Sequence, residues 1–227
     1  MGKAAVAEFV ATFALIFIGA GAVIQAVGSG QLDLVGVALA HGLVLAIMVS
    51  VTGHISGGLV NPAVTIALWV AGKISTFRAG ILIVAQLLGA VLGALLLRFV
   101  VGGDLFDAGG AGAPALGPDV PVGTGIVLEA ILTFFLVFVV FGTAIDAGGP
   151  WNKTAGFTIG LAIAFDILAF GPLTGAAMNP ARWFGPALVG GLWSDAIVWI
   201  VGPIAGAIIA SVLYTSVFLR SKEPVAP

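Results

Sequence analysis

Two copies of one tripeptide stand out among the residues that could do chemistry, Asn61-Pro62-Ala63 and Asn179-Pro180-Ala181. Asparagine caps helix starts, and proline suits the first helical position because its missing N–H is not needed there. Each copy nevertheless interrupts a very apolar stretch. A helix that begins inside a membrane must turn its free backbone toward protein or a water-filled cavity. The two copies therefore predict two half-helices whose positive ends point at a pore.

The side chains of Asn61 and Asn179 would act on whatever passes between them. If each oxygen accepts from backbone N–H groups of its own half-helix, each NH2 group is free to donate into the lumen. Two such donors, backed by two helix dipoles, would orient water oxygens and oppose the passage of cations, protons included. The alternative is that each asparagine merely caps its helix.

Arg182 lies three residues after Asn179, one turn along the same helix face. A charge at membrane depth costs roughly 2.5–3.5 kcal/mol even on a lenient insertion scale. Arg182 must therefore face water or a partner, and its place in the motif favours the pore. His41 lies in the middle of another apolar stretch, where the residue alone favours a histidine hydrogen-bonded between helices.

Composition places the chain in the membrane class. Of its 227 residues, 60% are hydrophobic and only 8% are charged, too few to cover a soluble domain. No basic run suggests nucleic acid, and the absence of cysteine excludes disulfides, thiolate nucleophiles and Cys-ligated metal sites. Nothing resembles a nucleophile–base pair, a phosphate-binding loop or a metal cluster, so we expect neither an enzyme nor a cofactor or metal.

Hydropathy predicts an all-α membrane protein with six full-length spans and two half-spans. Ten helical residues rise about 15 Å, half of a hydrocarbon core of about 30 Å, so the half-spans are re-entrant. The half-spans are Asn61–Val70 and Asn179–Val189. The full spans are roughly 4–27, 34–53, 79–101, 122–145, 154–172 and 195–219.

The two halves of the chain repeat. The segment that begins at Glu8 matches the one that begins at Glu129 at Glu, Thr, Phe, Leu and Phe, and the third and sixth spans each carry a GxxxG pair. Because each half has three spans, the second half must be inverted relative to the first. We therefore expect a single domain over 1–227, built from inverted repeats at about 1–101 and 122–220 and joined by an extended outer loop, 102–121.

Glu8 and Glu129 occupy corresponding places in these repeats. Carboxylates inside a membrane are candidates for a proton relay. We favour a structural role, in which they accept from loop N–H groups and hold the re-entrant segments.

Basic residues predict the orientation. One side of the six-span arrangement carries most of them, against Arg98 near the other face. Cytoplasmic loops are rich in Lys and Arg, so both termini are expected in the cytoplasm, at the cell or inner membrane. The residues on the basic side are Lys3, Lys73, Arg78, Lys153, Arg220 and Lys222.

Across nearly its whole length the chain resembles the aquaporin (major intrinsic protein) family, through the paired Asn-Pro-Ala motifs and the segments that lead into them, Gly53–Gly58 and Thr174-Gly175. The resemblance implies six tilted helices and two half-helices around one pore per subunit, usually in a homotetramer. It also implies passive conduction of water or small uncharged solutes across the bilayer. It places the outer constriction, or selectivity filter, at four positions, His41, Ile167, Ala176 and Arg182, a quartet that looks like the tonoplast-type branch.

Some positions depart from the common family pattern. Trp183 stands where the family has a small residue or, in glycerol channels, Asp, which argues mildly against glycerol and suggests packing behind the filter. Asp166 stands where tonoplast-type members often have Asn, and it could pair with Arg182, tune the filter or bond an outer-loop amide. Leu59 replaces a histidine common near the cytoplasmic mouth, which removes the usual candidate for pH gating there.

Three hypotheses follow for function. The first is a channel for water, with ammonia or other small neutral solutes, since Ile167 and Ala176 leave more room than a His–Thr pair would. The second is a glycerol-type facilitator, which His41 and Trp183 disfavour. The third, from another class, is a proton-coupled secondary transporter with broken helices at its centre.

Overall fold

The computed structural model describes residues 1–148 and 152–219, and every regular element in these ranges is helical. Six helices are long and apolar enough to cross a membrane, and their ends lie within a few residues of the predicted ones. The first span comprises α1 (Gly2–Ala14), a π-helical turn η1 (Leu15–Ala20) and α2 (Gly21–Val27). The others are α3 (Leu34–Thr52), α5 (Thr76–Val101), α7 (Val122–Val140) with its π-helical end η3 (Phe141–Ile145), α8 (Ala155–Thr174) and α10 (Ile197–Val217).

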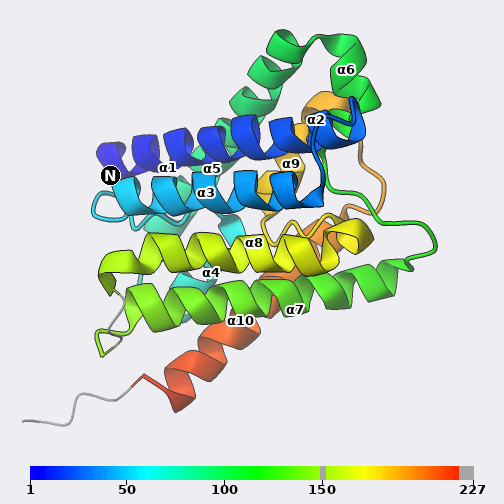
Figure 1. Ribbon diagram of the computed structural model, residues 1–227. Helices are drawn as coiled ribbons and strands as arrows, with labels where there is room; N and C mark the ends of the chain where they lie inside the picture. The colour runs from blue at the N-terminus through cyan, green and yellow to red at the C-terminus, as the bar shows by residue number, and fades with distance from the viewer. Residues whose placement is uncertain (149–151, 220–227) are drawn as a thin grey trace, which may run out of the picture.

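Two shorter helices, α4 (Pro62–Val70) and α9 (Pro180–Gly190), are the half-spans. Each packs against a span of the other half of the chain, α4 against α10 and α9 against α5. Among the spans, α1 runs along α5, α3 along α8 and α7 along α10. The half-helices are thus enclosed by a bundle to which both repeats contribute (Figure 1).

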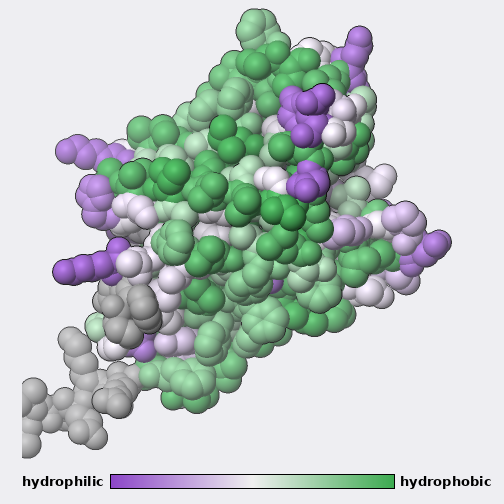
Figure 2. All heavy atoms as spheres, in the orientation of Figure 1, coloured by the Kyte–Doolittle hydropathy of each residue, from purple (hydrophilic) through white to green (hydrophobic). Residues whose placement is uncertain are grey.

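The long helices lie side by side, and the N-terminus and the C-terminal end of α10 lie at the same end of the bundle (Figure 1). Hydrophilic residues gather toward the two ends of the helices, and a hydrophobic belt separates them (Figure 2). Large apolar side chains such as Phe99 and Phe77 are exposed, 83% and 72%, on the outside of the bundle. The belt has the composition of a lipid-facing surface, so the chain is an integral, multi-pass membrane protein. Arg220 and Lys222, two of the basic residues that predict the orientation, lie outside the described residues.

Glycine pairs set how closely the helices cross. A Cβ built on Gly93 would lie 2.9 Å from the Phe13 carbonyl oxygen, and one on Gly89 would overlap the Phe9 carbonyl. In the second repeat, a Cβ on Gly202 would lie 2.8 Å from the Ile126 carbonyl oxygen. Small residues let backbones approach in this way where lipid supplies no hydrophobic drive. The two GxxxG pairs therefore mark the α1–α5 and α7–α10 crossings.

The connection 102–121 differs from the extended loop expected. It contains α6 (Gly103–Ala108) and a short 3-10 turn, η2 (Gly110–Gly112). The carboxylate of Asp104, in the first turn of α6, interacts favourably with the positive end of the helix dipole. Phe106 is fully buried, and the guanidinium of Arg98 lies 5.7 Å from its ring centre. One buried aromatic ring therefore anchors a segment whose Gly and Ala content resembles that of a loop.

Candidate pore

Each half-helix begins at its asparagine. Asn61 is the N-cap of α4, and its side-chain oxygen accepts from Ala63 N at 2.8 Å. Asn179 caps α9 and accepts from Ala181 N at 3.0 Å and Arg182 N at 3.3 Å. Pro62 and Pro180 follow at the first helical position of each. Each asparagine side chain therefore satisfies part of the free N–H groups at its helix start, one in α4 and two in α9.

The two caps are bonded to each other's loops. Asn61 Nδ2 donates to the Met178 carbonyl at 2.8 Å, and Asn179 Nδ2 donates to the Val60 carbonyl at 3.0 Å. Each NH2 group has two hydrogens, so this exchange leaves one on each asparagine. The expectation of wholly free NH2 groups is thus corrected. The reciprocal bonds hold the two helix tips together and fix where the remaining donors point.

The backbone at these tips is strained. Val60 and Met178 have φ of 55° and 52°, a left-handed conformation that a branched residue such as valine rarely adopts. Buried carboxylates compensate, because Glu8 accepts from Val60 N at 2.6 Å and Glu129 accepts from Met178 N at 2.7 Å. Strain of this kind persists only where the surroundings over-determine the conformation. The two carboxylates thus fix the backbone conformation of the loops that precede the half-helices.

The carboxylate of the first repeat has more partners. Glu8 also accepts from Ser56 Oγ at 2.6 Å, Leu59 N at 2.9 Å and Gln86 Nε2 at 2.7 Å. Gln86 is completely buried and also bonds Thr65. The amide of Gln86 therefore ties α5 to both the Glu8 cluster and α4.

The second repeat replaces this amide with aromatic packing. Glu129 accepts from Thr174 Oγ1 at 2.7 Å and Ala177 N at 2.9 Å, in addition to Met178 N. Trp183 is stacked on Trp199 with ring centres 6.2 Å apart, and Trp199 Nε1 donates to the Thr174 carbonyl at 3.0 Å. The Trp183 ring of α9 therefore packs against α10.

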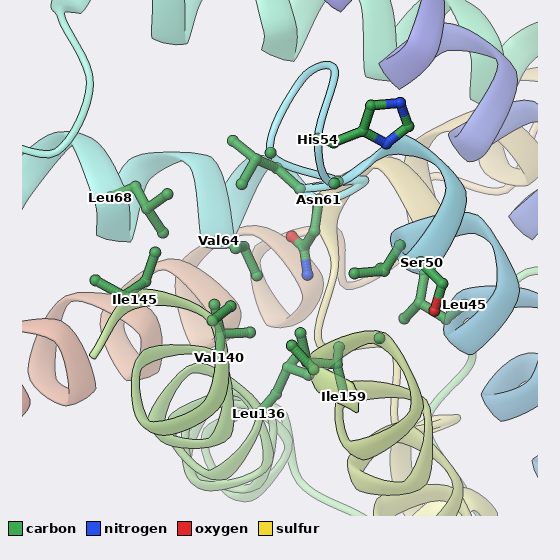
Figure 3. Close-up of a pocket in the computed structure, with 18 of the residues that line it drawn as sticks. Leu45, Ser50, His54, Asn61, Val64, Leu68, Leu136, Val140, Ile145 and Ile159 are labelled. Atoms are coloured by element: carbon green, nitrogen blue, oxygen red, sulfur yellow. The ribbon is translucent and has the colours of Figure 1, made fainter. Parts of the chain in front are cut away.

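Two cavities lie on either side of the joined tips. One, of about 350 Å³, reaches Asn61 and is lined by residues of α3, α4, α7 and α8 together with His54 and Lys153. Figure 3 shows the Asn61 amide nitrogen pointing into the space among Val64, Leu136 and Ile159. The other cavity, of about 480 Å³, is lined by Ile167 and Arg182.

Arg182 is held by two acceptors. It is 4% exposed, donates from Nε to His41 Nε2 at 2.9 Å and from Nη1 to the Gly112 carbonyl at 2.7 Å. His41 Nδ1 lies 2.9 Å from the Val37 carbonyl oxygen. This network assigns the proton to Nδ1, so that Nε2 can accept from Arg182. Both ring nitrogens of His41 are therefore engaged within the protein, and neither is free to bond a solute.

The resemblance placed four residues at the constriction, and the structure brings three of them together. Ile167 and Arg182 line the same cavity, and His41 is bonded to Arg182. Ala176 is buried, 2% exposed, and its N–H donates to Thr174 Oγ1 at 3.2 Å. It follows Gly175, which lines the cavity.

Six spans, two capped half-helices and an arginine that lines one of two cavities coincide with a sequence match. A family model described as major intrinsic protein matches residues 1–214. The chain belongs to the major intrinsic protein family.

Relatives and a solved structure within this family cover nearly the whole chain. Aquaporin TIP4-4 of Zea mays is 42% identical over 98% of this chain and 90% of its own length. Aquaporin-4 of Mus musculus is 40% identical over 97% of this chain and 69% of its own length. The X-ray structure of the aquaglyceroporin from Plasmodium falciparum superposes with a TM-score of 0.84 at 26% identity, covering 95% of this chain and 96% of that one.

One acid is unusual within this major intrinsic protein. Asp166 is 1% exposed, and its Oδ2 has no hydrogen-bond partner within 1–148 and 152–219. Arg182 directs its bonds to His41 and Gly112 instead. Over the same residues, no group of three or more His, Cys, Asp or Glu side chains is placed to hold a metal ion.

Sequence reasoning missed three partners of the site in this major intrinsic protein. Gln86 could have been found, because it is a lone amide in an apolar span, where polar side chains have partners. The Trp199 indole gave a weaker signal, since tryptophan is also common at membrane interfaces. The Gly112 carbonyl gave no sequence signal, because every residue has a backbone carbonyl and the residue type does not mark which one accepts.

Proposed function

We propose that this chain is a passive channel that conducts water. The observation that carries the proposal is the pair of reciprocal bonds, Asn61 to Met178 and Asn179 to Val60, which joins two helix starts between two cavities. Each helix start presents a positive dipole end and one remaining amide N–H. The names of the relatives, which are aquaporins, support the same function.

The passage would conduct by weak, oriented binding. The two remaining asparagine donors hold a water oxygen, which turns the hydrogens of that water away from the helix starts. Apolar side chains such as Val64, Leu136 and Ile159 line the cavity beside Asn61, so water there is held at few points and released readily. The positive helix ends and the Arg182 guanidinium oppose cations, protons included.

We propose Asn61, Asn179, Arg182, His41 and Ile167 as the residues that act on solutes, with Ala176 beside them. Asp166 has no role in this scheme. The chain is one channel domain, 1–227, of two inverted repeats, and the distribution of basic residues favours both termini in the cytoplasm. The assembly is a homotetramer, as the family resemblance implies.

The solute range extends to small neutral molecules such as ammonia. Ile167 and Ala176 contribute little polar surface to the constriction, so they admit weakly hydrated solutes. Glycerol is larger, and the Arg182–His41 pair crosses the same region. We therefore place glycerol below water and ammonia in rate.

Stopped-flow light scattering of reconstituted liposomes tests the proposal. Osmotic shrinkage should be faster than in empty liposomes and unchanged by an imposed proton or sodium gradient. Ammonia uptake should also rise, and glycerol uptake should rise far less. Uptake that saturates and follows an ion gradient would instead identify a coupled transporter, and shrinkage at the rate of empty liposomes would contradict the channel.

A further inference from the structure

The first span contains a π-helical turn, η1, between α1 and α2. Such turns insert an extra residue and are frequent at functional sites. Neither Gly19 nor Ala20, which end this turn, belongs to the proposed set of residues that act on solutes. Both nevertheless contact a partner of Arg182.

The backbone of Gly19 lies close to the imidazole ring of His41. A Cβ built on Gly19 would be 2.7 Å from both Nε2 and Cδ2 of the imidazole, closer than real Cβ contacts. The ring cannot turn away freely, because Nδ1 donates to the Val37 carbonyl and Nε2 accepts from Arg182. The space that His41 occupies therefore exists because position 19 has no side chain.

Ala20 supports the second acceptor of Arg182. A Cβ on Gly112 would lie 2.5 Å from the Ala20 carbonyl oxygen and 2.7 Å from Ala20 Cβ. Gly112 also has φ of 67°, a conformation that side chains disfavour. Gly112, whose carbonyl accepts from Arg182 Nη1, thus packs directly against the same turn.

We infer that the π-helical turn Leu15–Ala20 positions the guanidinium of Arg182, with Gly19 as the positioning residue for His41. The turn fixes the imidazole through Gly19 and the Gly112 carbonyl through Ala20, and these two groups fix Arg182. The inference rests on the proposed function, because it concerns the selectivity of that same pore.

One methyl group at position 19 should disturb this arrangement. The imidazole must move away from the first span, and it then loses its bond to Val37 or to Arg182. A displaced ring and a loosened guanidinium obstruct a passage that is already enclosed there, since both side chains are 4% exposed. We expect Gly19→Ala to lower water permeability per channel several-fold.

A double-mutant comparison separates positioning from a general packing defect. His41→Ala removes the ring atoms that the methyl would meet, so Gly19→Ala should cause no further loss of permeability in that background. Gly21→Ala is the matched control two residues along the same span, because its Cβ would meet only Leu97, at an ordinary 3.4 Å. It should behave as the unmodified chain.

Thermal unfolding in detergent provides a readout that does not depend on conduction. Gly19→Ala should lower the melting temperature in the unmodified chain and leave it unchanged in the His41→Ala background. If the single variant fails to fold, recovery of folded protein in the double variant supports the inference equally. Equal loss in both backgrounds, or no change in either, would overturn it. Slow shrinkage of liposomes with the unmodified chain would contradict the proposed function alone.

Discussion

Replacing Arg182 and His41 together by alanine is expected to raise glycerol and urea permeability at least about tenfold, which corresponds to roughly 1.4 kcal/mol in the barrier. The two side chains are bonded to each other at 2.9 Å and are both nearly buried, so their removal opens the region between the cavities. It also removes a fixed positive charge. Liposome swelling in glycerol and in urea measures the change, and water permeability should be retained.

Arg98→Ala is the matched control for this variant. It removes the same charge from the other described arginine near that face, whose Nη1 donates to the Val189 carbonyl at 3.3 Å and whose guanidinium lies over Phe106. Arg98 is exposed and does not line either cavity described above. Its removal should leave solute selectivity unchanged. Glycerol and urea rates that stay at the unmodified level in the double variant would contradict the filter assignment.

Glu8→Ala is expected to destabilise the fold on the order of 4 kcal/mol or more. Four buried donors, from Ser56, Leu59, Val60 and Gln86, would lose this acceptor. The N–H groups of Leu59 and Val60 have no other acceptor among the described residues, whereas Ser56 and Gln86 each keep a second one. An unsatisfied buried donor costs about 1–3 kcal/mol, and Val60 would also lose the bond that compensates its strained backbone. The loss is large against a typical total stability of about 5–15 kcal/mol. The yield of folded protein and the melting temperature in detergent measure it.

Thr12→Val provides the comparison on the same helix. Thr12 is completely buried like Glu8, but its hydroxyl has no hydrogen-bond partner among the residues that the structure describes. Replacing it by an isosteric apolar side chain removes no bond, so stability should be unchanged or slightly higher. A Glu8→Ala protein as stable as Thr12→Val would show that the carboxylate does not hold the loop.

Much of the fold could be predicted because membranes restrict backbone hydrogen bonding. Continuous apolar segments must be helical there, and α4 and α9 are too short to cross. The start of each was marked by Asn before Pro, a local signal that depends on no distant contact. The crossings of α1 with α5 and α7 with α10 were also marked, by glycine spacing.

What could not be predicted depends on contacts between distant segments. The amino-acid composition of the π-helical turn that ends at Ala20 does not distinguish it from the rest of the apolar span. Gly19 is one of 34 glycines in the chain. Its importance appears only once His41 lies against it. The Gly112 carbonyl likewise became a partner of Arg182 only through the folding of the outer connection, which holds a short helix with a buried Phe106 in place of an extended loop.

The central claim is that two capped helix starts meet beside a permanently wet passage. An experimental map of the protein in lipid, at a resolution that shows ordered water, tests it most directly. We expect water density within hydrogen-bond distance of the amide nitrogens of both Asn61 and Asn179, continuous with the two cavities. Dry packing around both carboxamides, or a half-helix that crosses the whole bilayer, would contradict the account.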